Sequence, residues 1–532
     1  MPETFDLVVL GGGHNGLVTA ALFAKAGWSV CVLERRHNIG GGCCTEEVTL
    51  PGFRHNLHSQ GHVYITGGPV FKSLELDKFG CQYVFPDPTC ACVFKDGRSI
   101  VFYRDLKATC ETIAQFSKKD AEAYRQMVNN FEPLNRLFVA SWYQPPLPPS
   151  KIYAAFEKSP GGLELLQMWN ASCQDIVNEY FESDQLKIAV LLMAMQGANL
   201  ADLYGVGAYV PILCSGMHSK PYGLCVGGSR YLAEAIARCL EANGGVIRKN
   251  ASVDRILIEK GEAKGVRLDD GTEIFARRAV ASNTNVKTLM LRHVGEEHLE
   301  ANFLRRVRAY KPDEVTPFTP HYALSEPPRY LASEKNPDVQ KAMFVSWGCE
   351  DMGAFARHAG DVRSGRLPQD VTGFSIAPSV HDPSQAPPGK HTAFVWQYAC
   401  YHLAGGAGKW DAVKEEYADY VEGVWRGYAP NMAGTNILKR FVYTPLEIER
   451  TNMAMFEGSF HHGLCSPNQM GSFRPFAGWS HYRMPIKKLY LCGSSSHPAG
   501  GVTGAPGFNC AGVIADDAQT KKWWWRASKS LA

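Results

Sequence analysis

A run of glycines near the amino terminus has the spacing of a nucleotide-binding turn. Gly11, Gly13 and Gly16 match the pattern G-x-G-x-x-G, which lets the backbone of a tight turn approach a pyrophosphate closely. Glu34 follows about 20 residues later, where the pattern places a carboxylate that binds a ribose hydroxyl. These residue types at this spacing predict a dinucleotide-binding site.

The elements around the glycines are those that such a site requires. The apolar run 7–10 predicts a buried strand, and the Ala-rich segment 17–26 predicts a helix directly after the turn. A second strand, over 28–33, carries the acid at its end. The free N–H groups and positive dipole end of the helix would face the pyrophosphate, so His14 and Asn15 join the predicted site. The alternative is a glycine-rich turn in an α/β unit without a nucleotide.

A second glycine turn follows the acid and bears on which dinucleotide is bound. Arg35 is followed by a second arginine and then by Gly40, Gly41 and Gly42. NAD does not need a second turn here, whereas an extended FAD would run along it, with Arg35 near phosphate or adenine. The alternative is a surface loop with two solvated arginines.

The composition excludes several classes of protein. The chain has 532 residues, 45% hydrophobic and 20% charged, with a formal net charge of +3, so it predicts a large folded protein and no nucleic-acid binding. No leader peptide and no membrane-spanning run is apparent, which predicts a cytoplasmic location. The 16 cysteines are scattered without C-x-x-C spacing and predict reduced core thiols.

Further segments resemble the phytoene desaturase-type flavoproteins: the stretch from Val226-Gly227-Gly228-Ser229 through Val253 to Asn283, and the closing stretch 489–509. Length and segment order are nearest to the carotenoid ketolase branch. The resemblance implies an α/β fold of the glutathione reductase and amine oxidase type. A discontinuous Rossmann-like FAD-binding domain would comprise residues 1–70, 215–300 and 445–532, and an inserted α+β substrate-binding domain would comprise residues 71–214 and 301–444.

The resemblance also implies cofactor contacts beyond the first turn. Val253 would contact adenine through its backbone, and the turn before the last helix would lie beneath the isoalloxazine ring. A helix amino terminus there would stabilise the negative charge that develops when the flavin accepts a hydride. The further residues expected to bind FAD are Asn283, Gly493, Gly501, Val502 and Thr503. Two residues depart from the family pattern: Ala499 stands where glycine is usual, and Phe508 replaces a common arginine, which would remove a charge near the flavin edge.

Histidines and one arginine are the candidates for catalysis. His55, His58 and His62 recur at short spacing, and the resemblance places this segment beside the flavin, so substrate contact by His58 is favoured over metal binding. His462 could accept a proton because an imidazole titrates near neutrality, and Arg474 could hold a carbonyl or carboxylate of the substrate. The structural alternatives are packed histidines and a salt-bridged arginine.

The function that the resemblance implies, together with these residues, is an FAD-dependent oxidoreductase acting on CH–CH groups. Flavin N5 would take a hydride and a side chain or water would take a proton, which leaves a C=C bond. The substrate would be hydrophobic or alicyclic, and the histidines favour a cyclic oxo-acid; the alternatives are a carotenoid desaturase or ketolase and a flavin-free lipid-binding escort protein of the same fold. Oxygen or a quinone would reoxidise the flavin. The run 521–526, basic and rich in tryptophan, would either touch a membrane surface or pack on the core.

Overall fold

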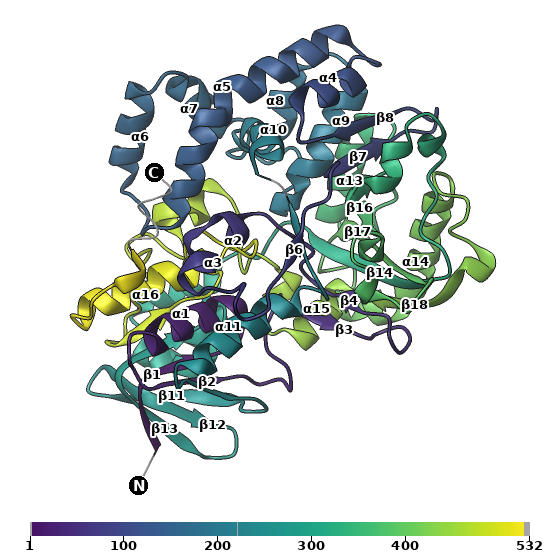
Figure 1. Cartoon of the computed structure of the whole chain (residues 1–532). Helices are drawn as coiled ribbons and strands as arrows, with labels where there is room; N and C mark the ends of the chain where they lie inside the picture. Colours follow the sequence, from purple (N-terminus) through teal and green to yellow (C-terminus); the bar gives the residue numbers. More distant parts are fainter. Residues whose placement is uncertain (1–2, 221, 526–532) are drawn as a thin grey trace.

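The computed structural model describes residues 3–220 and 222–525, and two separate sheets organise them (Figure 1). The first sheet has the order β10-β2-β1-β13, with β19 beside β13 and with β12 and β11 continuing from the other half of β13. Its strands are β1 (Glu3–Leu10), β2 (Val30–Leu33), β10 (Val246–Arg248), β11 (Val253–Glu259), β12 (Glu262–Leu268), β13 (Glu273–Ser282) and β19 (Leu489–Leu491). The pairs among β10, β2, β1, β13 and β19 are parallel, whereas β11, β12 and β13 form an antiparallel meander.

Both faces of the first sheet are buried, as expected for parallel strands. Leu7 and Val9 pack against a helical layer, and Val8 and Leu10 pack toward the meander on the other face. The helices of that layer are α1 (His14–Ala24), α11 (Arg230–Ala242) and α16 (Ala505–Asp517). Segments from the beginning, middle and end of the chain therefore share one core.

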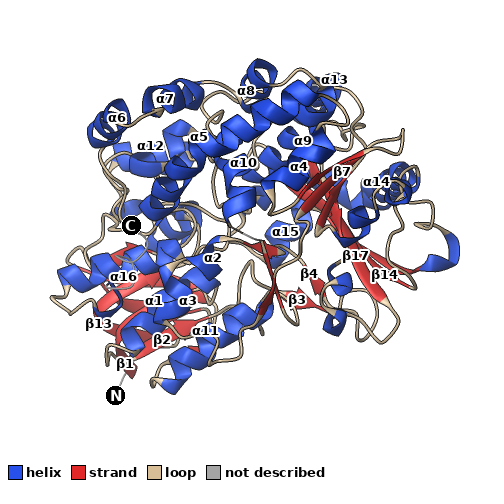
Figure 2. Ribbon diagram, turned by 45° about the horizontal axis from the view of Figure 1, so that its top comes forward, coloured by secondary structure: helices blue, strands red, loops and turns tan. Residues whose placement is uncertain are grey.

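The second sheet has the order β18-β14-β17-β16-β15-β7-β8 and lies apart from the first (Figure 2). Its strands are β7 (Cys90–Val93), β8 (Ser99–Phe102), β14 (Thr316–Leu324), β15 (Phe344–Ser346), β16 (Phe374–Ile376), β17 (His391–Ala399) and β18 (Ile437–Tyr443). The helices that share its core are α4 (Leu106–Ile113), α5 (Lys118–Trp142), α7 (Gly162–Asn170), α8 (Cys173–Tyr180), α9 (Asp184–Ala194), α10 (Tyr209–Ser219), α13 (Gly353–Arg363) and α14 (Trp410–Arg426).

The remaining helices are α2 (Tyr64–Gly67), α3 (Pro69–Ser73), α6 (Pro149–Lys158), α12 (Ala301–Ala309) and α15 (Pro445–Thr451). Two small sheets are formed by β3 (Thr45–Glu46) with β4 (His55–Asn56), and by β5 (Gly61–His62) and β6 (Tyr83–Val84) on either side of β9 (Gly223–Cys225).

The fold class expected from the sequence is confirmed, with corrections at element ends. The helix after the glycine turn begins at His14 and ends at Ala24, because it starts directly at the turn. The predicted strand 28–33 is shorter, Val30–Leu33. The exact domain boundaries remain a prediction, although the strands of the two sheets come from the two predicted sets of ranges.

The tryptophan-rich run packs on the core as far as the structure describes it. Trp524 is buried with its ring centroid 5.7 Å from that of Phe23, and Nε1 of Trp523 donates to the carbonyl of Leu22. Arg526, the last residue of the run, lies outside the described residues. Within the described ranges no helix is long and apolar enough to cross a membrane. Membrane contact by this run stays a prediction.

Candidate active site

The first glycine turn is built for close approach. Gly11 has φ +89°, a conformation that suits glycine. A Cβ on Gly13 would lie 2.4 Å from Nδ2 of Asn283, and one on Gly16 would lie 2.5 Å from the carbonyl oxygen of Gly11. Gly13 therefore leaves room for the side chain of Asn283, while Gly16 lets α1 pack against the end of β1.

The amino terminus of α1 opens into a cavity of about 320 Å³. Gly13, as N-cap, has no side chain to cap the helix, and the first turn carries no acidic residue, so its N–H groups and dipole are available to an anion. His14 and Asn15 line the cavity. The side-chain oxygen Oδ1 of Asn15 is buried and has no hydrogen-bond partner within the described ranges.

The acid and the second glycine turn meet the first turn. Oε2 of Glu34 accepts a hydrogen bond of 2.8 Å from the N–H of Gly12, which places this carboxylate at the cavity wall. A Cβ on Gly41 would lie 3.1 Å from Cα of Gly13, so the two turns are in contact. Arg35, Gly42 and Val253 line the same part of the cavity.

The closing turn meets the cavity from the other side. Gly501 and Val502 line it, with φ +102° and +53°. Thr503 does not line the cavity. Its Oγ1 instead accepts a hydrogen bond of 3.0 Å from the N–H of Ala505 at the start of α16. Gly493 does not line the cavity either. A Cβ on Gly493 would lie 3.0 Å from the carbonyl oxygen of Asn283.

The two departures from the family pattern have different consequences. Ala499 has φ +107°, a strained conformation for a residue with a Cβ, which explains why glycine is expected there. Phe508 is fully buried and stacks on Trp525, with ring centroids 5.6 Å apart. It does not line the cavity, so the interpretation of this position as an altered flavin edge is wrong.

Aromatic side chains from the second sheet line the far part of the cavity. Phe344 on β15, Phe374 on β16 and Phe394, Trp396 and Tyr398 on β17 all face it. Ring centroids are 5.3 Å apart for Phe344 and Phe374 and 5.9 Å apart for Phe374 and Trp396. Sequence analysis missed this aromatic wall, although the alternation of Phe394, Trp396 and Tyr398 is the period of a strand with one face toward a cavity.

The predicted histidines are buried and neutral. His58 lines the cavity, and burial, with a smaller contribution from Arg36, lowers its pKa to about 4. His462 also lines the cavity, and burial, followed by the charge of Arg474, lowers its pKa to about 3. The other two members of the His55–His62 group do not line it.

Arg474 does not reach the cavity, and its predicted contact with substrate is not what the structure shows. The side chain is fully buried, and its guanidinium donates to the carbonyl oxygens of Ser494 at 2.8 Å and His461 at 2.6 Å, among others. It forms no ion pair with the described carboxylates. Arg474 instead joins the segment 461–464 to the loop after β19, because a buried guanidinium must satisfy its N–H groups.

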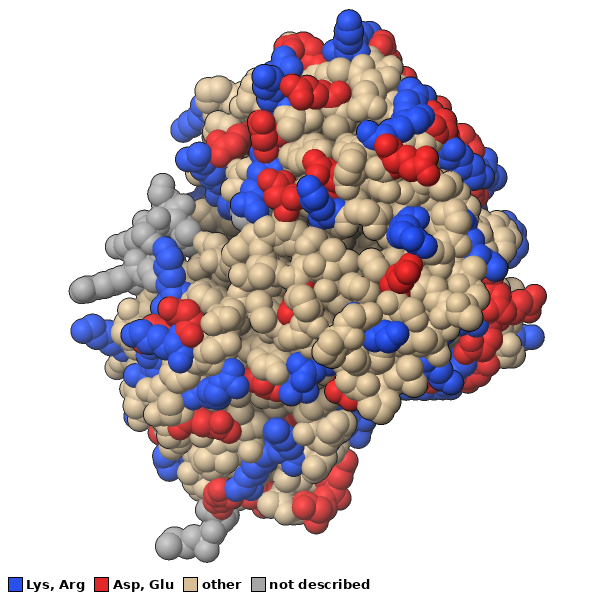
Figure 3. Space-filling view, turned by 45° about the vertical axis from the view of Figure 1, so that its right-hand side comes forward, with Lys and Arg blue, Asp and Glu red and all other residues tan. Residues whose placement is uncertain are grey.

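Charge is evenly spread over the face of the molecule in Figure 3, with both signs interspersed around a largely uncharged, hollowed middle. The cations that line the cavity within the described ranges are Arg35, Arg36 and Arg292. These lie on the nucleotide side: Arg35 donates to the carbonyl of Thr451, and Nη1 of Arg292 lies 3.9 Å from the sulfur of Met453. The aromatic wall carries no Lys or Arg among the described lining residues.

Comparison with known proteins agrees with this geometry. Residues 9–74 match the model of the NAD(P)-binding Rossmann-like domain. The chain is 30% identical to one of the subunits of limonene dehydrogenase from Castellaniella defragrans, over 99% of this chain and 97% of that protein. It is 31% identical to pyridine nucleotide-disulfide oxidoreductase domain-containing protein 2 of Mus musculus, over 97% and 94%. It is 23% identical to the neurosporene-forming phytoene desaturase of Cereibacter sphaeroides, over 94% and 92%.

Solved structures share the fold at lower identity. An oxidoreductase from Methanosarcina mazei superposes with a TM-score of 0.65 at 18% identity, covering 96% of this chain and 99% of that one. Cyclohexylamine oxidase from Brevibacterium oxydans superposes with a TM-score of 0.54 at 14% identity, covering 97% and 99%. With the glycine turns, the shared cavity and these relatives together, the chain belongs to the phytoene desaturase-like family of FAD-dependent oxidoreductases.

Proposed function

We propose that this protein binds FAD between the two glycine turns and the closing turn, and dehydrogenates an uncharged hydrophobic substrate held against the aromatic wall. The observation that supports this most strongly is that one cavity has both linings. Gly13, Glu34 and Val253 border one part of it, and Phe374 and Trp396 border another. An oxidoreductase needs its cofactor and its substrate in one enclosed space.

The residues present fit FAD. A Cβ on Gly13 would clash with the side chain of Asn283, which also lines the cavity, and Oδ1 of Asn15 is a buried acceptor still without a partner among the described residues. Glu34 is positioned to accept a ribose hydroxyl in addition to the N–H of Gly12. FAD, when bound, supplies the acceptor for a hydride. The chain supplies the anion site at α1 and, at the start of α16, a helix dipole whose positive end favours negative charge nearby.

An uncharged hydrocarbon fits the far part of the cavity better than a cyclic oxo-acid. A carboxylate would need a cation or several donors there, and Arg474 is already bound to carbonyl oxygens. His58 and His462 are held neutral by burial. Aromatic rings bind apolar ligands by close packing and exclude water. The oxo-acid expectation rested on histidines whose burial lowers their pKa and so disfavours the charged form.

Two hydrocarbon classes remain, and each has a relative that points to it. One relative, which matches 99% of this chain, is named for limonene, a compact cyclic hydrocarbon, and another is named for phytoene, a long polyene. We favour the compact class because the aromatic wall forms one closed cluster, in which Trp396 packs against Phe460 at 5.4 Å between ring centroids. A carotenoid is the second candidate. The product in either case has one more C=C bond.

Anaerobic titration tests this function. The purified protein should show a flavin band near 450 nm, and a cyclic monoterpene hydrocarbon should bleach it without oxygen. The same protein is then titrated with phytoene in detergent and with a cyclic oxo-acid. Bleaching by the oxo-acid alone would contradict the substrate class, and protein without any flavin band would contradict the cofactor.

A further inference from the structure

His461 lies where the aromatic wall meets the closing turn. Its side chain lines the cavity. A Cβ on Gly500 would lie 3.0 Å from Cδ2 of His461, so the ring rests directly on the turn. The ring centroid is 4.3 Å from that of Phe460, which packs against Trp396 of the aromatic wall. A substrate that extends from the wall to the turn would pass this imidazole.

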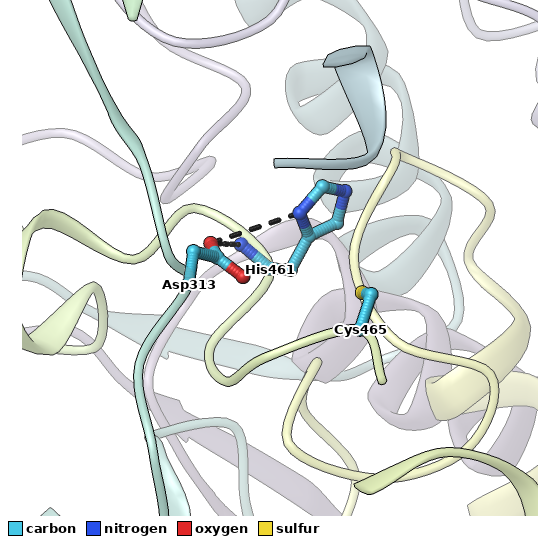
Figure 4. Close-up of side chains that lie close together, drawn as sticks. All are labelled: Asp313, His461 and Cys465. Carbon is cyan, nitrogen blue, oxygen red and sulfur yellow. Dashed lines mark hydrogen bonds and ion pairs between the residues drawn. The ribbon is translucent and has the colours of Figure 1, made fainter. Parts of the chain in front are cut away.

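A buried carboxylate stands behind that ring. Oδ2 of Asp313 accepts a hydrogen bond of 3.0 Å from the backbone N–H of His461 and lies 3.7 Å from its Nδ1. The side chain of Asp313 has no exposed surface. Oδ1 of Asp313 and Nδ1 of His461 are buried and have no other partner within the described ranges. Figure 4 shows the two side chains facing each other, with the second ring nitrogen, Nε2, pointing away from Asp313.

We propose that His461 is the proton acceptor of the dehydrogenation and that Asp313 is its positioning residue; this rests on the function proposed above. Asp313 holds the proton on Nδ1, which leaves the lone pair on Nε2, on the side of the ring away from Asp313. One substrate carbon gives its proton to Nε2, and the electron pair of that C–H bond becomes the new C=C bond. The neighbouring carbon loses a hydride to the oxidised flavin. The imidazolium that results is stabilised by the carboxylate beside it.

His58 and His462, the two catalytic candidates from the sequence, lack such support. Arg474, a cation, contributes to the lowered pKa of His462, and Arg36 does the same for His58. Neither has a carboxylate in hydrogen-bond or ion-pair contact within the described ranges. A proton on His462 would face the positive charge of Arg474, whereas a proton on His461 would face the negative charge of Asp313.

A metal ion is the competing use of this cluster. Donor atoms of Asp313, His461 and Cys465 all lie within 4.8 Å of one another. However, burial raises the pKa of the Cys465 thiol to about 12, and its sulfur contacts the carbonyl oxygen of Gly463 at 4.0 Å. Metals bind the thiolate, which this site disfavours.

The first test is independent of turnover. Nitrogen-15 labelling of histidine in the flavin-bound protein, with assignment by loss of a signal in His461→Gln, reports which ring nitrogen carries the proton. We expect the proton on Nδ1 in the wild type and a shift of the population toward Nε2 in Asp313→Asn. A proton on Nε2 in the wild type would overturn the proposal, as would stoichiometric metal in the purified protein.

The second test measures flavin reduction in a single anaerobic turnover with the monoterpene. We expect His461→Gln to slow reduction by roughly 10²–10⁴-fold and Asp313→Asn to slow it by at least tenfold, with substrate dissociation constants within threefold of wild type. The matched control is His358→Gln. His358 is buried on α13 and forms a hydrogen bond with the carbonyl oxygen of Tyr398, a contact that glutamine can keep. The rate of flavin reduction in His358→Gln should therefore stay within twofold of the wild-type rate.

The outcomes separate this inference from the proposed function. Suppose that the monoterpene bleaches both the wild type and a His461→Gln variant that is folded and holds flavin. If the two rates are equal, the proposed role of His461 is wrong and the proposed function stands. If no hydrocarbon bleaches the wild type, both are wrong. If Asp313→Asn fails to fold, the tautomer of His461 in the wild type and the rate of flavin reduction in His461→Gln still test the proposal.

Discussion

Gly13 and Asn283 lie so close together that a methyl group on Gly13 would be 2.4 Å from the amide nitrogen of Asn283. The two residues come from the ends of different strands, β1 and β13, which are parallel neighbours. Both residues line the cavity beside the uncapped start of α1, where the diphosphate of FAD is proposed to lie.

Gly13→Ala should therefore weaken FAD binding by about tenfold, equivalent to about 1.4 kcal/mol. The added Cβ pushes the Asn283 side chain into the space above the turn. Flavin content after gel filtration and fluorescence titration of the apoprotein measure the effect. Gly67→Ala is the control, because a Cβ there meets nothing within 4 Å; equal flavin loss in both variants would contradict the role of the turn.

Ala499→Gly should stabilise the protein. Ala499 has φ +107°, and removing its Cβ relieves a strain of about 1 kcal/mol. The greater conformational entropy of glycine in the unfolded chain offsets part of this gain. Urea denaturation followed by flavin release and by circular dichroism measures the gain. Ala515→Gly, at a buried position in the last turn of α16, should be destabilising. A loss of stability in Ala499→Gly would show that the turn is not strained.

His62→Gln should reduce the sensitivity of the fold to acid. Burial lowers the pKa of His62 to about 3, below its value of about 6.5 in the unfolded chain. The unfolded state therefore binds the proton first, and stability that is complete above pH 6.5 is lost as the pH falls toward 3. This histidine alone accounts for about 2 kcal/mol between pH 6.5 and 5.

The test for His62 compares melting temperatures at pH 7.5 and pH 5. The melting temperature of the wild type should fall more between pH 7.5 and pH 5 than that of His62→Gln. Because the side chain bonds Tyr83 and Ser59, the variant is expected to be less stable at pH 7.5, and only the difference between the two pH values is interpreted. An identical loss in both proteins would count against a neutral, buried His62.

Trp396→Ala should weaken substrate binding by roughly 10–100-fold, because it removes a large ring from the aromatic wall. Flavin content should stay the same, since Trp396 lies on β17, away from the glycine turns. Perturbation of the flavin spectrum on titration with substrate measures the affinity. Phe473→Ala is the control, as that side chain is 40% exposed and does not line the cavity. Unchanged affinity in Trp396→Ala would place the substrate elsewhere.

The cofactor side of this protein was readable from local patterns. A strand, a glycine turn, a helix and a second strand ending in Glu34 are contiguous in sequence, and each residue type has a local reason for its position. The closing turn with Gly501 and Val502, in contrast, was expected from the resemblance to a known family and not from a local pattern alone. Such motifs are readable because the backbone conformation that they need restricts the residue types allowed.

The substrate side was decided by tertiary structure. Phe344, Phe374 and Trp396 belong to strands far apart in sequence, and only the register of the second sheet aligns them on one face. The same holds for Arg474, whose charge suggested a substrate contact but whose buried position commits it to carbonyl oxygens. Asp313 and His461 are 148 residues apart, and nothing near either residue indicates the other. Sequence alone determines which turns can hold a dinucleotide, because that is a local backbone property. Which side chains face one another across the cavity depends on long-range packing.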